Sequence, residues 1–209
     1  MRFACAETTG ELVTVLFSLL ILAVVLTFTW VLAPTAPPWG TAAAVVVVLA
    51  LAIARAVRTG EWGVRASAFA PALARSAAIT AVAAVAFYAA GVQLGTWHTR
   101  GNPWGMLAAL VPWGLGQQFA LHTVFLREAQ TTVSRPAGIW IAAAMFAALH
   151  LPNPFLTVMT GVGALAWCWI YDRYPNLLPM ALSHALLTLV ILYAFDDAIT
   201  GRLRVGAGY

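Results

Sequence analysis

The sequence predicts an all-α polytopic membrane protein, a bundle of about seven transmembrane helices with room for an eighth. Of its 209 residues, 62% are hydrophobic and 9% are charged, whereas a soluble domain is about one-quarter charged. The mean hydropathy is +0.87. Apolar runs long enough to cross a bilayer recur along the chain. These observations exclude a soluble globule, and the low charge excludes a disordered chain.

The first four spans are expected over residues 11–33, 41–56, 72–95 and 104–125. A cluster of three prolines at 34–38 ends the first span. The stretch RAVRTGEWGVRASAF, residues 55–69, carries three Arg and a Trp and predicts an interfacial segment before the third span. The polar loop TWHTRGNPW, residues 96–104, separates the third span from the fourth.

The last three spans are expected over residues 137–151, 155–171 and 177–195. LPNP, residues 151–154, separates the fifth from the sixth because proline cannot continue helical hydrogen bonding. YDRYPN, residues 171–176, forms the next turn. At this length we expect one domain, with two N-terminal helices in residues 1–60, a core in 61–195 and a polar tail in 196–209.

The arginines predict the orientation, since the chain contains no lysine. With seven spans, the side of the N-terminus carries eight arginines and the other side three. The first set is Arg2, Arg55, Arg58, Arg65, Arg75, Arg127, Arg135 and Arg173, and the second is Arg100, Arg202 and Arg204. The positive-inside rule therefore predicts a cytoplasmic N-terminus. The lysine-free, Ala- and Arg-rich composition is typical of a GC-rich bacterial genome, which favours a bacterial plasma membrane.

Other sequence features exclude several classes of protein. The run from residue 12 to 32 is too long for the apolar region of a signal peptide and should stay as the first span. The basic residues are scattered, so we interpret them as loop charges and expect no nucleic-acid partner. Cys5 and Cys168 are too few for a disulfide framework or a thiolate metal site.

Polar residues inside the spans are the candidates for chemistry, because each is costly in lipid. Counted from the cytoplasmic helix ends, four of them lie roughly 9 to 21 Å deep, in the middle of a core about 30 Å thick. These four are Gln118, His122, His150 and His184. Three helices therefore bring polar faces to similar depths and should converge in the bundle interior. The candidates are Gln117, Gln118 and His122 on the fourth span, His150 on the fifth, and His184 and Thr188 on the seventh.

Structural interpretations also apply to these residues. A single intramembrane histidine is often only an interhelical hydrogen bond, and Gln and Thr commonly join helices in the same way. His98 lies in a polar loop and is expected to be solvated. The presence of three histidines at matching depth is what favours a functional site.

The three segments, in this order, resemble the motifs of the CPBP family of CAAX proteases and bacteriocin-processing membrane proteins, also called Abi. That family has EExxxR on one helix, FxxxH on the next and HxxxN two helices later. Here QQFALH (117–122) occupies the first position, FAALH (146–150) matches the second, and HALLT (184–188) matches the third at its histidine. The resemblance covers residues 61–189 and implies the helical core of that family.

The sequence departs from the family pattern at four positions. Gln117 and Gln118 replace both glutamates, His122 replaces the arginine, and Thr188 replaces the asparagine. The resemblance implies that the first glutamate and the second-motif histidine activate water, while the third motif stabilises an oxyanion. An amide cannot accept a proton as a carboxylate does. The glutamate-water mechanism is therefore not carried over.

Three hypotheses follow for the function. The first is an intramembrane hydrolase or related enzyme in which His150 or His184 is the base, acting on a membrane-embedded peptide or lipid-like substrate. The second is a pseudoprotease that binds a membrane partner protein without cutting it. The third is a metal-dependent enzyme with a single ion at His122, His150 and His184, since three neutral imidazoles suit Zn, Fe or Cu.

Overall fold

The protein is helical, with no strand among the residues that the structure describes. The computed structural model describes the backbone of residues 4–209 and the side chains from residue 15 onward. Five segments are long and apolar enough to cross a membrane: Val15–Thr35, Gly40–Thr59, Ala66–Gln93, Pro154–Arg173 and Leu177–Ala194. The predicted all-α membrane fold is confirmed, and the chain is an integral membrane protein. Arg2, which entered the predicted orientation, lies outside the described residues.

The fourth and fifth predicted spans differ from the other five. The fourth consists of α4 (Pro103–Phe119), followed directly by a π-helix, η4 (Ala120–Leu126). The Gln pair and His122 lower the hydropathy of this segment, and it is not among the five candidate spans. The fifth is α6 (Arg135–Ala148), with 14 residues. A helix of that length rises about 21 Å, less than the hydrocarbon thickness of about 30 Å.

The chain forms two compact units. Unit 1 contains the chain up to Trp62, Ala120–Cys168 and Arg204–Tyr209. Unit 2 contains Gly63–Phe119 and Trp169–Leu203. Helix α7 (Pro154–Arg173) runs from the first unit into the second.

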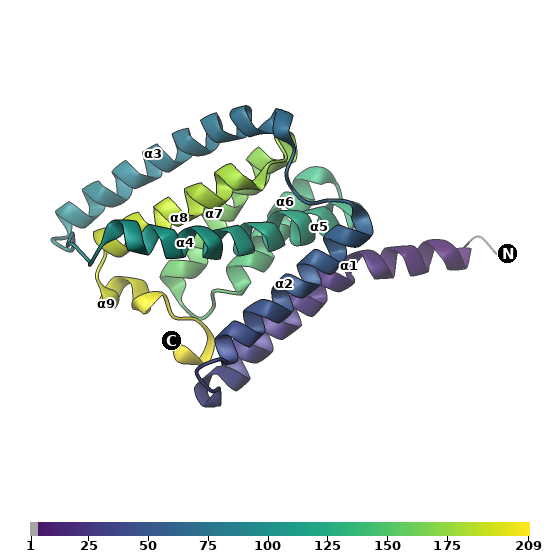
Figure 1. Ribbon diagram of the computed structural model, residues 1–209, viewed down its shortest axis with the longest axis horizontal. Coiled ribbons are helices and arrows are strands. Elements are labelled where there is room, and N and C mark those ends of the chain that lie inside the picture. Colours follow the sequence, from purple (N-terminus) through teal and green to yellow (C-terminus); the bar gives the residue numbers. More distant parts are fainter. Residues whose placement is uncertain (1–3) are drawn as a thin grey trace. The chain divides into compact units, whose positions relative to one another are not determined.

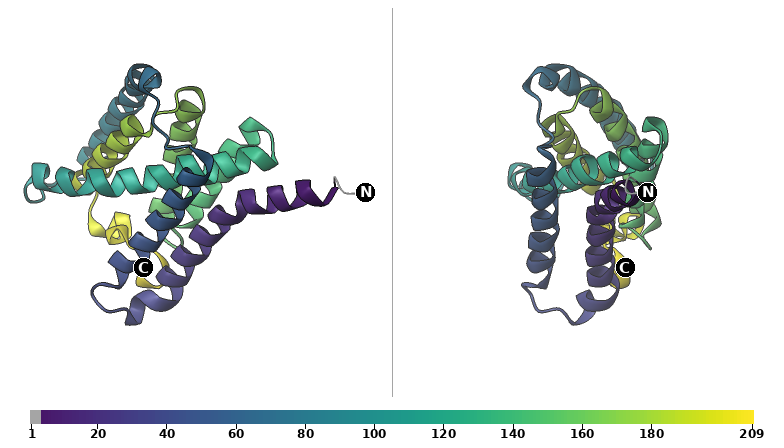
Figure 2. Two further views of the ribbon diagram at one scale, coloured as in Figure 1. Left: turned by 45° about the vertical axis from the view of Figure 1, so that its right-hand side comes forward. Right: turned by 90° about the vertical axis from the view of Figure 1, so that its right-hand side faces the viewer.

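Unit 1 begins with two helices that lie side by side, α1 and α2 (Figures 1 and 2). Helix α2 ends at Gly60, whose φ of 73° is the left-handed conformation that glycine adopts readily at a helix end. The short segments η1 and η2 lie between α1 and α2, and the other helical segments of the unit follow η4 or lie near the C-terminus. The bounds are α1 Ala4–Thr27, η1 Phe28–Leu32, η2 Ala33–Thr35, α2 Gly40–Thr59, α5 Arg127–Thr132, α6 Arg135–Ala148 and η6 Gly206–Gly208.

Unit 2 is built around α8, which lies against both α3 and α4 (Figure 1). The hydroxyls of Thr80 on α3 and Ser183 on α8 hydrogen-bond at 2.6 Å. Asn176 caps the start of α8 by accepting a hydrogen bond from the Leu178 backbone N–H at 3.2 Å. The elements of this unit are η3 Ala66–Ala68, α3 Phe69–Gln93, α4 Pro103–Phe119, α8 Leu177–Ala194, α9 Asp197–Thr200 and η5 Gly201–Leu203.

Candidate functional site

Two of the predicted site residues meet inside unit 2. The Gln118 side-chain nitrogen, on α4, lies 3.0 Å from Nδ1 of His184, on α8. Both side chains are buried, with Gln118 0% and His184 8% exposed. The convergence that the sequence predicted is therefore observed for the first and third motifs at this pair.

Gly114 allows the two helices to approach at this point. A Cβ built on Gly114 would lie 3.1 Å from the Ala181 carbonyl oxygen and 3.6 Å from Cβ of His184. Gly114 precedes Gln118 by four residues, about one helical turn, so it lies on the same face of α4. The absence of a side chain at Gly114 thus brings the amide of Gln118 within reach of the imidazole.

The hydrogen bond to Gln118 determines the protonation of the His184 ring. An amide nitrogen only donates hydrogen bonds, so Nδ1 of His184 accepts from it. In a neutral imidazole the other nitrogen then carries the proton. His184 is therefore arranged to donate from Nε2, which suits it to polarise a carbonyl oxygen.

The other two predicted site residues of unit 2, Gln117 and Thr188, have different environments. Thr188 donates its hydroxyl proton to the His184 backbone carbonyl at 2.9 Å, within α8. Gln117 is half-buried, and within the described part of the chain its Oε1 is buried without a hydrogen-bond partner. A buried acceptor of this kind is costly unless a ligand or water satisfies it. The Gln117 oxygen is consequently a candidate contact for a substrate N–H.

His150, in unit 1, has the opposite hydrogen-bonding arrangement to His184. Its Nδ1 lies 2.8 Å from the backbone carbonyl oxygen of Phe146, which can only accept. The two rings of the FxxxH motif also pack together, with centroids 5.0 Å apart. Nδ1 therefore carries the proton, and Nε2 presents a lone pair, as a general base requires.

His122, also in unit 1, lies in the π-helix η4 (Ala120–Leu126), all seven residues of which are buried. Stretches of π-helix are rare and occur frequently at functional sites. We expected the QQxxxH motif to lie on an α-helix, and nothing in the sequence indicated the π-helix. Nδ1 of His150 bonds to the Phe146 carbonyl and not to His122.

Unit 1 also contains a buried ion-pair cluster that the sequence analysis did not find. Arg55 and Glu128 are 5% and 1% exposed in their side chains, with Nε and Oε1 3.4 Å apart. The second Glu128 oxygen accepts the Ser18 backbone N–H at 2.8 Å. We expected Arg55 to be a loop charge at the end of the second span, but it pairs inside the protein because Glu128 comes close to it in the fold.

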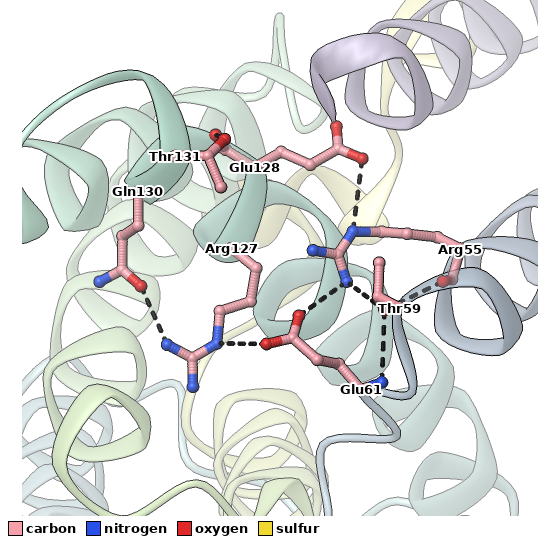
Figure 3. A network of polar contacts seen from close by, with 7 residues as sticks. All are labelled: Arg55, Thr59, Glu61, Arg127, Glu128, Gln130 and Thr131. Carbon is pink, nitrogen blue, oxygen red and sulfur yellow. Dashed lines mark hydrogen bonds and ion pairs between the residues drawn. The ribbon is translucent and has the colours of Figure 1, made fainter. Parts of the chain in front are cut away.

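Two further charged residues extend this cluster (Figure 3). Glu61 accepts from Arg55 at 3.1 Å and lies 3.8 Å from Arg127. Arg127 also donates to Gln130 at 3.0 Å. Burial raises the pKa of the Glu128 carboxyl, and the hydrogen bonds from Ser18 and the Arg55 charge oppose the rise. The cluster joins α1, α2 and α5 and is separate from the predicted motifs.

The predicted three-histidine metal site finds no geometric support. Among the described residues, no group of three or more His, Cys, Asp or Glu side chains is placed to hold a metal ion. The three-histidine metal site is therefore not confirmed within the described part of the chain.

The sequence of the motif region matches one known family. The family model of type II CAAX prenyl endopeptidase Rce1-like proteins matches residues 99–190. This segment is Rce1-like. The Rce1-like segment contains all three motifs singled out in the sequence, and the predicted resemblance to the CPBP family is confirmed. No curated protein and no solved structure matches the chain.

Proposed function

We propose that this CAAX-protease-like membrane protein is a hydrolase or related enzyme that uses imidazole in place of glutamate. The observation that carries the proposal is the Gln118–His184 hydrogen bond, at 3.0 Å between buried groups. It makes Nε2 of His184, in the third motif, a proton donor, although Gln replaces both glutamates of the first motif. The substrate is a membrane-embedded peptide or lipid-like molecule, and a prenylated C-terminal peptide is the first class to test.

The proposed roles follow from the hydrogen bonds of each histidine. His184 donates from Nε2 to a carbonyl oxygen as negative charge develops there. His150 accepts a proton from water at Nε2. Gln117 accepts a substrate N–H at its buried oxygen. His122 and Thr188 remain predicted site residues, the first through its buried position in η4 and the second through its bond to the backbone of His184.

Substitution of each histidine tests these roles. In detergent-purified protein, His150→Ala and His184→Ala should each lower turnover of a prenylated peptide by about 10²- to 10⁴-fold, the usual contribution of a general acid or base. His98→Ala is the matched control, since this histidine lies in the loop before α4 and should leave turnover unchanged. Full activity in either site variant would refute its assigned role.

A second candidate function is a pseudoprotease that binds a membrane peptide or protein without cutting it. The replacement of both motif glutamates by amides favours it, because neither Gln117 nor Gln118 can act as a base. The double variant Gln117→Glu/Gln118→Glu separates the two functions. A wild-type chain that binds the peptide uncut, while the double variant cleaves it, would establish the pseudoprotease and exclude the enzyme.

A further inference from the structure

One end of unit 2 brings together the ends of three candidate membrane spans. Helix α3 begins there after η3, α7 ends there at Arg173, and α8 begins at Leu177. Two backbone hydrogen bonds hold the connecting segments together, from Arg65 N–H to the Pro175 carbonyl at 3.0 Å and from Leu177 N–H to the Gly63 carbonyl at 2.9 Å. This end of the unit therefore lies at a boundary between the apolar spans and a polar phase.

Three arginines are exposed at this end: Arg65, Arg75 and Arg173. Among the described residues none of the three forms an ion pair, whereas Arg55 and Arg100 each pair with a carboxylate. The same segments contain a single carboxylate, Asp172, which is half-buried and has interactions of its own. Within the described part of the chain, no carboxylate pairs with the positive charge of this surface.

Aromatic rings hold two of these guanidinium groups in place. The Cζ atom of Arg75 lies 4.1 Å from the centroid of the Tyr174 ring, and that of Arg173 lies 4.1 Å from the Trp169 ring. Each guanidinium uses Nη1 for a carbonyl of its own helix, that of Pro71 at 3.0 Å for Arg75 and that of Trp169 at 3.3 Å for Arg173. A guanidinium has five N–H donors, so most remain available to a ligand.

We propose that Arg65, Arg75 and Arg173 form a binding surface for the phosphate of an anionic phospholipid. Arg75 lies within the span that starts at Ala66 and reaches back along its helix to Pro71, as an arginine does when it extends toward the interface. Guanidinium groups bind phosphate through paired N–H donors. Tyr and Trp rings prefer the headgroup level. A lipid headgroup at this end would meet all of these groups, and this inference is independent of the proposed activity.

Lipid titration of the full-length protein tests the surface. Binding of a phosphatidylglycerol and of a phosphatidylcholine with the same acyl chains is measured by native mass spectrometry in a nonionic detergent. The wild type should bind the anionic lipid more tightly. Arg75→Gln/Arg173→Gln should weaken that binding roughly 25-fold, about fivefold for each arginine, and leave phosphatidylcholine binding unchanged. Arg65→Gln, a milder variant, should lose about fivefold.

The matched control is Arg58→Gln/Arg204→Gln, which removes two exposed arginines of unit 1 and the same total charge. It should keep wild-type affinity for phosphatidylglycerol. Equal affinity of the wild type for the two lipids would overturn the proposal. An equal loss in the control variant would also overturn it, because net charge and not this surface would then explain the binding.

Discussion

The orientation of one amide determines the chemistry available to His184. Because Gln118 presents its nitrogen to Nδ1, the imidazole keeps its proton on Nε2 and acts as a donor. A glutamate at the same position would accept from Nδ1–H and leave the lone pair on Nε2 instead. In the proposed function, Gln in place of Glu in the first motif therefore alters the role of the third-motif histidine, in addition to removing a base.

At the same scale, Glu128 shows the conflict between burial and ion pairing. Its carboxyl is 1% exposed and has Arg55 and the Ser18 N–H as partners. Burial is nevertheless the largest influence and raises its pKa above the ordinary value of 4.5. Buried ion pairs often fail to recover the whole cost of desolvation. The contribution of Glu128 to the stability of the protein should therefore depend on pH.

The first prediction concerns Glu128→Gln. A carboxyl whose pKa is raised on folding contributes stability fully below its unfolded pKa and loses that contribution as the pH rises through its folded pKa. The Tm of the wild type relative to Glu128→Gln should therefore fall as the pH is raised from about 4.5 toward neutrality. Thermal unfolding in detergent between about pH 4 and 8 measures this difference.

Glu61→Gln is the matched control for that experiment, since its side chain belongs to the same cluster but is 43% exposed. Its Tm difference from the wild type shows what the exposed part of the cluster contributes at each pH, for comparison with Glu128→Gln. A wild type that gains stability over Glu128→Gln as the pH rises would show that the attraction of Arg55 outweighs burial.

At the scale of elements, close contact between helices is what positions the polar pair in unit 2. Gly114 on α4 faces the Ala181 carbonyl of α8, and at the other end of α8 Gly91 of α3 lies against the Ala194 backbone. Small residues at such crossings let helix backbones approach and allow polar side chains to bond across them. Helix α8 is held by α3 through Thr80 and Ser183 on one side and by α4 through Gln118 on the other.

The second prediction is that Gly114→Ala destabilises the protein by about 1–3 kcal/mol, the usual cost of overpacking. The new Cβ would be 3.1 Å from a backbone carbonyl, which cannot move aside as a flexible side chain can. Thermal unfolding measures the loss. Gly105→Ala on the same helix is the control, because the nearest atom to its Cβ is an Asn102 side-chain nitrogen at 3.7 Å. Equal effects of the two substitutions would show that α4 and α8 are not closely packed at Gly114.

At the scale of the whole molecule, the arginines and the spans together specify a topology. The third candidate span, Ala66–Gln93, separates the loop after α2 from the loop before α4. Most arginines lie on the predicted side of the N-terminus. The positive-inside rule therefore predicts that the first of these loops is cytoplasmic and that the second is on the other side of the membrane.

The third prediction tests that orientation with single cysteines at Arg58 and Gly101, in a chain whose Cys5 and Cys168 are replaced by serine. A membrane-impermeant maleimide should label Gly101→Cys in intact cells, and Arg58→Cys only after permeabilisation. Because one span lies between the two positions, exactly one of them should be labelled in intact cells. Labelling of Arg58→Cys alone in intact cells would show that the orientation is the opposite of the predicted one.

Much of the fold could be predicted from the sequence, because membrane spans are marked locally. Hydrophobic runs and prolines located five spans close to their observed bounds, such as residues 177–195 for α8, observed as Leu177–Ala194. The π-helix η4 was not predicted, and α6 ends at Ala148, three residues before the predicted end of its span. Both depend on where hydrogen bonding changes within an apolar stretch, and composition does not specify that.

The sequence by itself determined that the protein lies in a membrane and which few residues could do chemistry there, because the cost of each polar group in lipid is a property of residue type. Only the tertiary structure decided which of them are partners. It joined Gln118 to His184, and it buried Arg55, which the sequence predicted to be a loop charge, against Glu128. These pairs form between residues up to 73 positions apart, and partner choice at such a separation depends on helix packing, which no local pattern encodes.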